Sequence, residues 1–176
     1  MQIFRDGVAA KLGHDHVVQA TTFSGRVTYD PSAPGTSSVA AQVHTATLKV
    51  DDAETRRKFR LSGQPTTTDV AEIEKSMKAE GQLDVSRFPM ITFASTMITP
   101  QTQDRYLVTG QLTIRGVTRA VRFPANLVME GNVFRATATL TLMQSAFGYP
   151  PYSALLGAIK NKDAVMLHID IVAVPE

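Results

Sequence analysis

The sequence predicts an all-β protein with short helices, folded as an eight-stranded antiparallel up-and-down barrel. Several segments of the chain alternate apolar and polar side chains, which is the period of a strand buried on one face. Turn residues separate many of these segments, so neighbouring strands can reverse direction over short connections. Closure into a barrel removes exposed edges, and a two-sheet sandwich is the competing arrangement. The eight expected strands cover residues 7–12, 17–29, 39–50, 91–99, 106–115, 120–129, 133–144 and 165–174.

The first half of the chain also contains a polar loop and two expected helices. Residues 30–38 are rich in proline, serine and glycine and are expected on the surface. Residues 51–60 place acids before bases, an order that suits the helix dipole and indicates a solvated basic face. The next helix ends near Gly81, and Asp69 with Glu72 resembles its capping box. Its narrow apolar stripe is expected to lie against the sheet and consists of Val70, Ile73 and Met77.

The middle of the chain carries the clearest strand pattern. Pro89 fixes its own φ and favours an extended Phe88, so the chain enters residues 91–99 as a strand. Residues 106–115 alternate in the same way and are expected to pair with that strand. Gly116 can then supply the positive φ that a tight hairpin turn needs. A second turn is expected at residues 130–132, before the alternating segment 133–144.

The C-terminal part is expected to contain one short helix and a last strand. Pro150, Pro151 and Ser153 precede residues 154–160, a plausible helix of one to two turns that could cover an open end of the barrel. The final segment, 165–174, alternates again, so a slip of one residue would expose a whole apolar row.

Length and composition indicate a single domain over residues 1–176. Hydrophobic residues make up 43% of the chain, which is enough for a substantial core. The net charge of +2 is spread along the chain, and the basic run 56–60 lacks interleaved stacking aromatics, so no nucleic-acid partner is expected. The chain has no apolar run long enough for a membrane span and no visible export signal. We therefore expect a cytoplasmic protein as the sequence stands, or a periplasmic one if a signal was removed.

A barrel of eight strands has room either for packed side chains or for one small ligand. If a ligand is present, the apolar faces of the strands would line its site, and the same residues could equally fill a dry core. The candidate ligand-binding residues are Phe93, Val108, Leu112, Ile114, Phe123, Leu127, Phe134, Leu140, Leu142 and Ile169.

Several short motifs resemble those of one known family. The motifs are Leu83-Asp84-Val85 before Phe88-Pro89, Ile91-Thr92-Phe93 with Ser95, Gly110-Gln111-Leu112-Thr113-Ile114 with Gly116-Val117-Thr118 and Val121, and Phe147-Gly148. They are similar to the YceI-like family, lipocalin-like proteins whose antiparallel barrel holds a long isoprenoid or related lipid. The resemblance implies binding and sequestration or transport of a polyisoprenoid, quinone-like or other long-chain lipid, without catalysis and without a cofactor.

The segment Gly13-His14-Asp15-His16 could carry metal or acid–base chemistry. In an extended chain His14 and His16 fall on one face and could share a metal if a third ligand converges. The candidates for that ligand are His44, His168 and Asp170. A metal-binding protein or metal-dependent enzyme is therefore the alternative function. The favoured interpretation is a polar turn at the barrel rim, where the imidazoles could also meet a ligand's polar head.

No motif for a catalytic nucleophile is present. The sequence has no cysteine, no Gly-x-Ser-x-Gly and no glycine-rich loop ending in Gly-Lys-Ser/Thr, so we do not expect an enzyme. Residues 149–152, Tyr-Pro-Pro-Tyr, fit an aromatic ligand platform or, preferably, a rigid turn with packed rings. A third possibility is a surface that meets another protein, and a homodimer is one such assembly.

Overall fold

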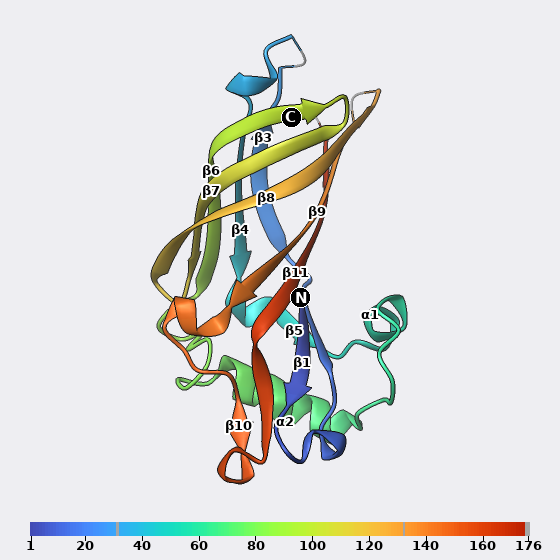
Figure 1. The fold of residues 1–176 in the computed structure, drawn as a ribbon, viewed down its shortest axis with the longest axis vertical. Helices are drawn as coiled ribbons and strands as arrows, with labels where there is room; N and C mark the ends of the chain where they lie inside the picture. The colour runs from blue at the N-terminus through green and yellow to red at the C-terminus, as the bar shows by residue number, and fades with distance from the viewer. Residues whose placement is uncertain (31, 132, 175–176) are drawn as a thin grey trace.

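The computed structural model describes residues 1–30, 32–131 and 133–174. Within these ranges one antiparallel sheet curls around an interior, while α2 (Thr67–Lys78) crosses its lower end and α1 (Ala53–Lys58) lies at its side (Figure 1). The strands are β1 (Gln2–Asp6), β2 (His16–Ala20), β3 (Phe23–Thr28), β4 (Ser38–His44), β5 (Leu48–Val50), β6 (Met90–Thr102), β7 (Arg105–Ile114), β8 (Val117–Glu130), β9 (Val133–Met143), β10 (Ser153–Ala154) and β11 (Ile159–Ala173). Single 3₁₀ turns lie at Ala10–Leu12, Pro34–Thr36, Thr45–Thr47, Gln144–Phe147 and Leu155–Gly157.

The order of the strands shows how the sheet curls. Neighbours follow the order β3-β4-β6-β7-β8-β9-β11-β1-β2-β5, and β10 pairs with β11 beside this path. β2 and β3 therefore lie near opposite ends of the order, although only Thr21 and Thr22 separate them in the chain. The chain itself thus bridges the two ends of the curled sheet.

The strand count differs from the expected eight. The described residues form eleven strands, and their hydrogen-bonded order does not close on itself. Two expected long strands are each divided: residues 17–29 break at Thr21–Thr22, and residues 39–50 break at the 3₁₀ turn Thr45–Thr47. The all-β class with few helices is confirmed, but as a curled antiparallel sheet.

The central strands pair as predicted. Phe93 of β6 lies opposite Leu112 of β7, which confirms the expected pair. Ile114 then pairs with Val117 across a two-residue turn in which Arg115 and Gly116 have φ of 51° and 73°. A Cβ on Gly116 would lie 2.7 Å from the Phe88 ring, so this position favours glycine for space as well as for φ.

Two other elements differ from the expectation. Residues 7–12 were expected as a strand, but they form a turn followed by the 3₁₀ helix Ala10–Leu12. Gly7, at the start of this turn, has a φ of 94°, and the strand β1 lies before it. Residues 154–160, expected as a helix, contain β10, a 3₁₀ turn and the start of β11. Leu155 and Leu156 have φ of 49° and 54°, which an α-helix cannot accommodate. Pro31 and Asn132, which fall in expected turns, lie outside the described residues.

α2 lies where the sequence predicts a helix and begins slightly earlier. Its capping box is formed by Thr66 and Asp69, in place of the expected pair Asp69 and Glu72. Ile73 and Met77 pack against the buried cluster at this end of the sheet, as the apolar stripe predicts. In the described ranges no helix is both long and apolar enough to cross a membrane.

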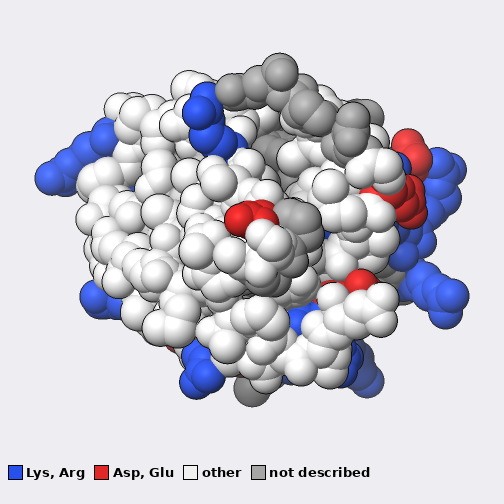
Figure 2. Space-filling view, turned by 90° about the horizontal axis from the view of Figure 1, so that it is seen from above, with Lys and Arg blue, Asp and Glu red and all other residues white. Residues whose placement is uncertain are grey.

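The end of the molecule opposite α2 is formed by strand ends and turns. Figure 2 looks onto this end, where lysine and arginine lie mainly around the rim and uncharged atoms cover most of the face. A second buried cluster lies inside the sheet toward this end and consists of Ile98, Tyr106, Val108, Phe123 and Ala125.

Candidate ligand-binding cavity

The curled sheet encloses a cavity of about 500 Å³. This volume lies within the range of pockets that bind small molecules. Nine strands, β2 to β9 and β11, contribute to the wall, and Thr55, Lys58 and Phe59 add to it from α1 and the residue after it. Most lining side chains are apolar, because the inward positions of each strand carry its apolar row.

All ten residues that the alternating pattern selects lie at this wall. Six are buried, namely Val108, Leu112, Ile114, Phe123, Phe134 and Leu142, and the other four are partly buried, namely Phe93, Leu127, Leu140 and Ile169. The interior is therefore not filled solid by its own side chains. The sequence left both a dry core and a ligand site open, and the geometry provides room for a ligand.

Two phenylalanine rings in the cavity wall pack against each other. The centroids of Phe93 and Phe123 lie 5.9 Å apart in a tilted arrangement. Gly110 on the adjacent strand makes room for the Phe93 ring, since a Cβ there would lie 2.5 Å from it and 2.6 Å from the carbonyl oxygen of Ala94. Glycine at this strand position thus marks a close approach.

Tyrosine hydroxyls lie at the end of the cavity far from α2. Tyr29 follows β3, and its ring centroid lies 5.7 Å from that of Phe134. The hydroxyls of Tyr29 and Tyr106 lie 3.2 Å apart, and this hydrogen bond, followed by burial, raises the pKa of Tyr106 to about 12. The nearby Ser37 hydroxyl also lines the cavity and is buried without a hydrogen-bond partner among the described residues.

α1 and the residue after it contact both β2, through Thr55 and Gln19, and the C-terminal half of β11, and we call this part of the cavity wall the seam. Lys58 lies 3.7 Å from the carboxylate of Asp170, and the ring of Phe59 packs 4.7 Å from that of His168. The His168 imidazole also lies 2.8 Å from the Gln2 amide oxygen. Burial is the main cause that lowers the pKa of His168, so its ring favours the neutral form. All four side chains that meet across the seam line the cavity.

A second, smaller cavity of about 280 Å³ lies beneath α2. Ile73, Ser76 and Met77 reach it from the helix, and residues of β1, β2 and β5 form its opposite side. The two cavities share Met1, Val18, Leu83 and Tyr149 in their walls, so they adjoin each other. Residues 149–152, interpreted from the sequence as a rigid turn, form an irregular segment; Tyr149 lines both cavities and Tyr152 lines the smaller one.

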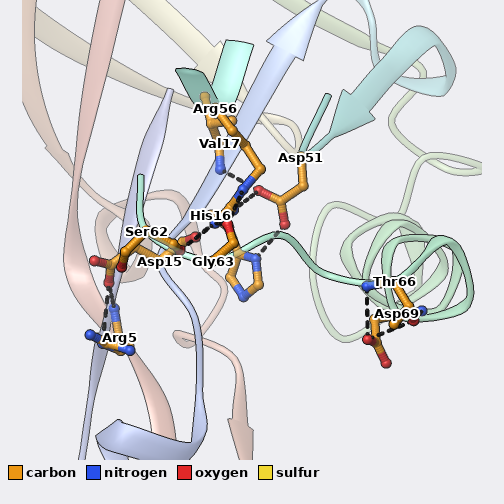
Figure 3. A network of polar contacts seen from close by, with 10 residues as sticks. All are labelled: Arg5, Asp15, His16, Val17, Asp51, Arg56, Ser62, Gly63, Thr66 and Asp69. Atoms are coloured by element: carbon orange, nitrogen blue, oxygen red, sulfur yellow. Dashed lines mark hydrogen bonds and ion pairs between the residues drawn. The ribbon is translucent and has the colours of Figure 1, made fainter. Parts of the chain in front are cut away.

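His16 forms part of a buried polar network beside the smaller cavity (Figure 3). Its Nδ1 lies 2.6 Å from one carboxylate oxygen of Asp51, and the other oxygen accepts hydrogen bonds from the Val17 amide and the Arg56 guanidinium at 3.0 Å and 2.7 Å. Burial alone would raise the pKa of Asp51. The hydrogen bonds from His16 and Val17 and the contact with Arg56 outweigh burial and hold that pKa below its ordinary value.

Sequence reasoning missed Arg56. The basic run 56–60 was expected on a solvated face, yet Arg56 is only 1% exposed. Its guanidinium donates to Asp51 and to the backbone carbonyls of Asp15, Ser62 and Gly63. The only available signal was that Asp51 and Arg56 lie five residues apart around a helix start, a spacing that does not distinguish a buried pair from an exposed one.

The two histidines of the predicted metal pair have different surroundings. His16 is bound to Asp51, whereas His14 is exposed and lies beside Gly63. His168 and Asp170 lie on β11 at the seam of the larger cavity. In the part of the chain that the structure describes, no group of three or more histidine, cysteine or acidic residues could hold a metal ion. The metal-site alternative therefore lacks a third ligand there.

The chain matches known proteins over most of its length. The model of the YceI-like domain matches residues 7–173. A UPF0312 protein of Shewanella sp. (strain W3-18-1) is 31% identical over 144 residues, which are 78% of this chain and 66% of that protein. A UPF0312 protein of Enterobacter sp. (strain 638) is 30% identical over 110 residues, which are 62% of this chain and 47% of that protein. The chain thus spans just under two thirds, or about half, of the length of these relatives.

Solved structures show the same fold. Burkholderia cenocepacia BcnA superposes with a TM-score of 0.70 at 19% identity, covering 98% of this chain and 96% of that one. The Campylobacter jejuni YCEI protein gives a TM-score of 0.69 at 13% identity, covering 91% and 85%. The curled sheet, the motifs in the central strands and the match over residues 7–173 lead to one conclusion: the chain belongs to the YceI-like family.

Proposed function

We propose that this protein binds a long apolar small molecule in the larger cavity and sequesters or carries it without chemical change. The observation that carries the proposal is the cavity of about 500 Å³, whose wall is mostly apolar and includes all ten predicted residues. Burying apolar surface contributes about 0.8 kcal/mol per methylene, so a long chain needs few polar contacts to bind tightly.

A polyisoprenoid or quinone-like lipid suits this site best. Its chain is long and apolar, and membership of the YceI-like family supports this class of ligand. As part of this proposal the ligand enters beneath α1, where Lys58 and Phe59, which belong to no strand, contact Asp170 and His168. The proposed function involves no catalytic step. That the protein forms a homodimer stays a prediction, which light scattering in solution would test.

A chain-length series tests the proposal. Straight-chain hydrocarbons of increasing length should bind more tightly by about fourfold per added methylene, the equivalent of about 0.8 kcal/mol, until the cavity is full. Displacement of a fluorescent apolar probe measures each affinity. A branched isoprenoid hydrocarbon of matched carbon number shows whether the site prefers isoprenoid chains. Absence of binding, or an affinity that does not change with length, would contradict the proposal.

A further inference from the structure

The smaller cavity differs from the larger one in its polar content. About half of the residues that line it carry polar groups, namely His16, Glu72, Ser76, Gln82, Gln144, Asn161 and the two tyrosines Tyr149 and Tyr152. Leu83, Ile73 and Met77 provide part of the apolar remainder. Such a mixture suits a group that forms hydrogen bonds and is joined to an apolar chain.

The contact with the Asp51 carboxylate fixes the orientation of the His16 imidazole. The ionised carboxylate of Asp51 can only accept hydrogen bonds, so the Nδ1 that lies 2.6 Å away must carry the proton. The other ring nitrogen, Nε2, has no hydrogen-bond partner among the described residues and is available to a ligand in the cavity. Because Asp51 is itself held by Arg56 and the Val17 amide, the imidazole is presented to the cavity in one orientation.

Tyr149 provides a matching donor. Tyr149 is 5% exposed as a residue, and its hydroxyl, which has no hydrogen-bond partner among the described residues, is open to the cavity and not sealed in the core. Burial raises the pKa of this hydroxyl to about 12, so it keeps its proton at neutral pH. A ligand oxygen in the cavity would accept a hydrogen bond from this open hydroxyl.

The charges around the smaller cavity disfavour an anionic head group on the ligand. No lysine or arginine side chain lines the smaller cavity, and Glu72 places a carboxylate there. The nearby guanidinium of Arg56 is committed to Asp51 and to three backbone carbonyls. A phosphate or carboxylate would therefore enter a site without a lysine or arginine partner, next to a negative charge.

We propose that the smaller cavity holds the uncharged polar head of the ligand, one with hydroxyl or carbonyl oxygens, while the tail extends past Leu83 and Tyr149 into the larger cavity. This inference rests on the proposed function, because it assigns an orientation to the same ligand. The shared wall of the two cavities, Met1, Val18, Leu83 and Tyr149, marks where the chain would pass.

The opposite orientation would place the head at the far end of the larger cavity. The hydroxyls of Tyr29 and Tyr106 are there, but they already pair with each other at 3.2 Å. Among the described residues at that end, Ser37 carries the buried hydroxyl that lacks a partner, whereas beneath α2 both the Tyr149 hydroxyl and Nε2 of His16 are free to meet a ligand. The two ends can be distinguished by single-hydroxyl variants.

Three probes with the same tail test the head-group chemistry: dodecane, dodecanol and dodecyl phosphate. We expect dodecanol to bind about 5- to 10-fold more tightly than dodecane, as one or two satisfied hydrogen bonds provide, and dodecyl phosphate to bind more weakly than dodecanol. Dodecyl phosphate binding as tightly as dodecanol, or more tightly, would overturn the inference.

Variants then locate the head. Tyr149→Phe removes only the hydroxyl and should abolish most of the advantage of dodecanol while leaving dodecane affinity unchanged. Tyr106→Phe and Ser37→Ala are the matched controls at the other end and should leave that advantage intact. If instead either control variant removes the advantage, or Tyr149→Phe has no effect, the head does not lie beneath α2. That result would leave the proposed function standing, whereas failure of all three probes to bind would remove both.

Discussion

The carboxylate of Asp51 and the guanidinium of Arg56 lie 2.7 Å apart at a site where their side chains are 0% and 2% exposed. This ion pair joins the end of β5 to α1 and connects through the Asp15 carbonyl to the turn before β2. It thereby fixes α1 against the sheet, so that the residues after Arg56 reach the seam of the larger cavity.

Loss of Arg56 should destabilise the fold strongly. Arg56→Leu leaves the buried Asp51 charge with weaker compensation and three backbone carbonyls without their donor, so we expect a loss of about 3–5 kcal/mol in the free energy of unfolding. Urea denaturation measures it. Arg57→Ala, on the exposed side of the same helix, is the control and should change that free energy by about 0.5 kcal/mol or less. Similar effects of the two variants would contradict a structural role of the pair.

Acid should weaken the same network. The folded pKa of Asp51 is lowered, so its contribution to stability is complete above the unfolded pKa of about 3.9 and disappears as the pH falls through the lower folded value. The difference in unfolding free energy between the wild type and Asp51→Asn should therefore be constant near neutral pH and shrink below about pH 4. If that difference in unfolding free energy does not change with pH, the charge of the Asp51 carboxylate does not contribute to stability.

Gly110 should not tolerate a side chain. In Gly110→Ala the new Cβ would overlap the Phe93 ring and the Ala94 carbonyl oxygen, and we expect a loss of about 1–3 kcal/mol in unfolding free energy. Gly81→Ala is a suitable control, because a Cβ at Gly81 has no neighbour within 4 Å. Equal stability of the two variants by urea denaturation would show that Phe93 does not need this space.

The contact of Phe59 with His168 should slow the exchange of ligand. In Phe59→Ala the seam between β2 and β11 loses its aromatic cover, so we expect dissociation of a bound apolar probe to be several times faster, with a smaller change in stability. Stopped-flow displacement measures that rate, and Arg57→Ala again provides the control. If the rate is unchanged in Phe59→Ala, the ligand leaves elsewhere.

The sequence was sufficient to predict the strands in which apolar and polar residues clearly alternate. The prediction was wrong for segments whose secondary structure depends on tertiary contacts. Phe93 and Leu112 were placed correctly because their strands keep a period of two and are linked by recognisable turns. Residues 154–160 have a helix-like composition, but Ile159 pairs with Ala154, so they form the tip of a short hairpin between β10 and β11. Local propensity is weak enough for such contacts to override it.

The apolar wall of the site followed from the same alternation, whereas its polar part did not. All ten predicted residues face the larger cavity, since an inward position on a strand is determined by period alone. The network of His16, Asp51 and Arg56 depends on contacts up to 41 residues apart in the chain, between Asp15 and Arg56, which no local spacing reveals. The role of Tyr149 likewise depends on the packing that brings its irregular segment to the same cavity as α2.

Filling the larger cavity tests the central claim most directly. Ala138 lines it from β9, and Ala138→Phe should occupy the space of the ligand, whereas Thr141→Phe on the same strand is exposed and outside the cavity wall. Native mass spectrometry with an added long-chain hydrocarbon compares the three proteins after circular dichroism has shown that each is folded. We predict a bound hydrocarbon in the wild type and Thr141→Phe and none in Ala138→Phe; equal occupancy in all three would contradict binding inside the sheet.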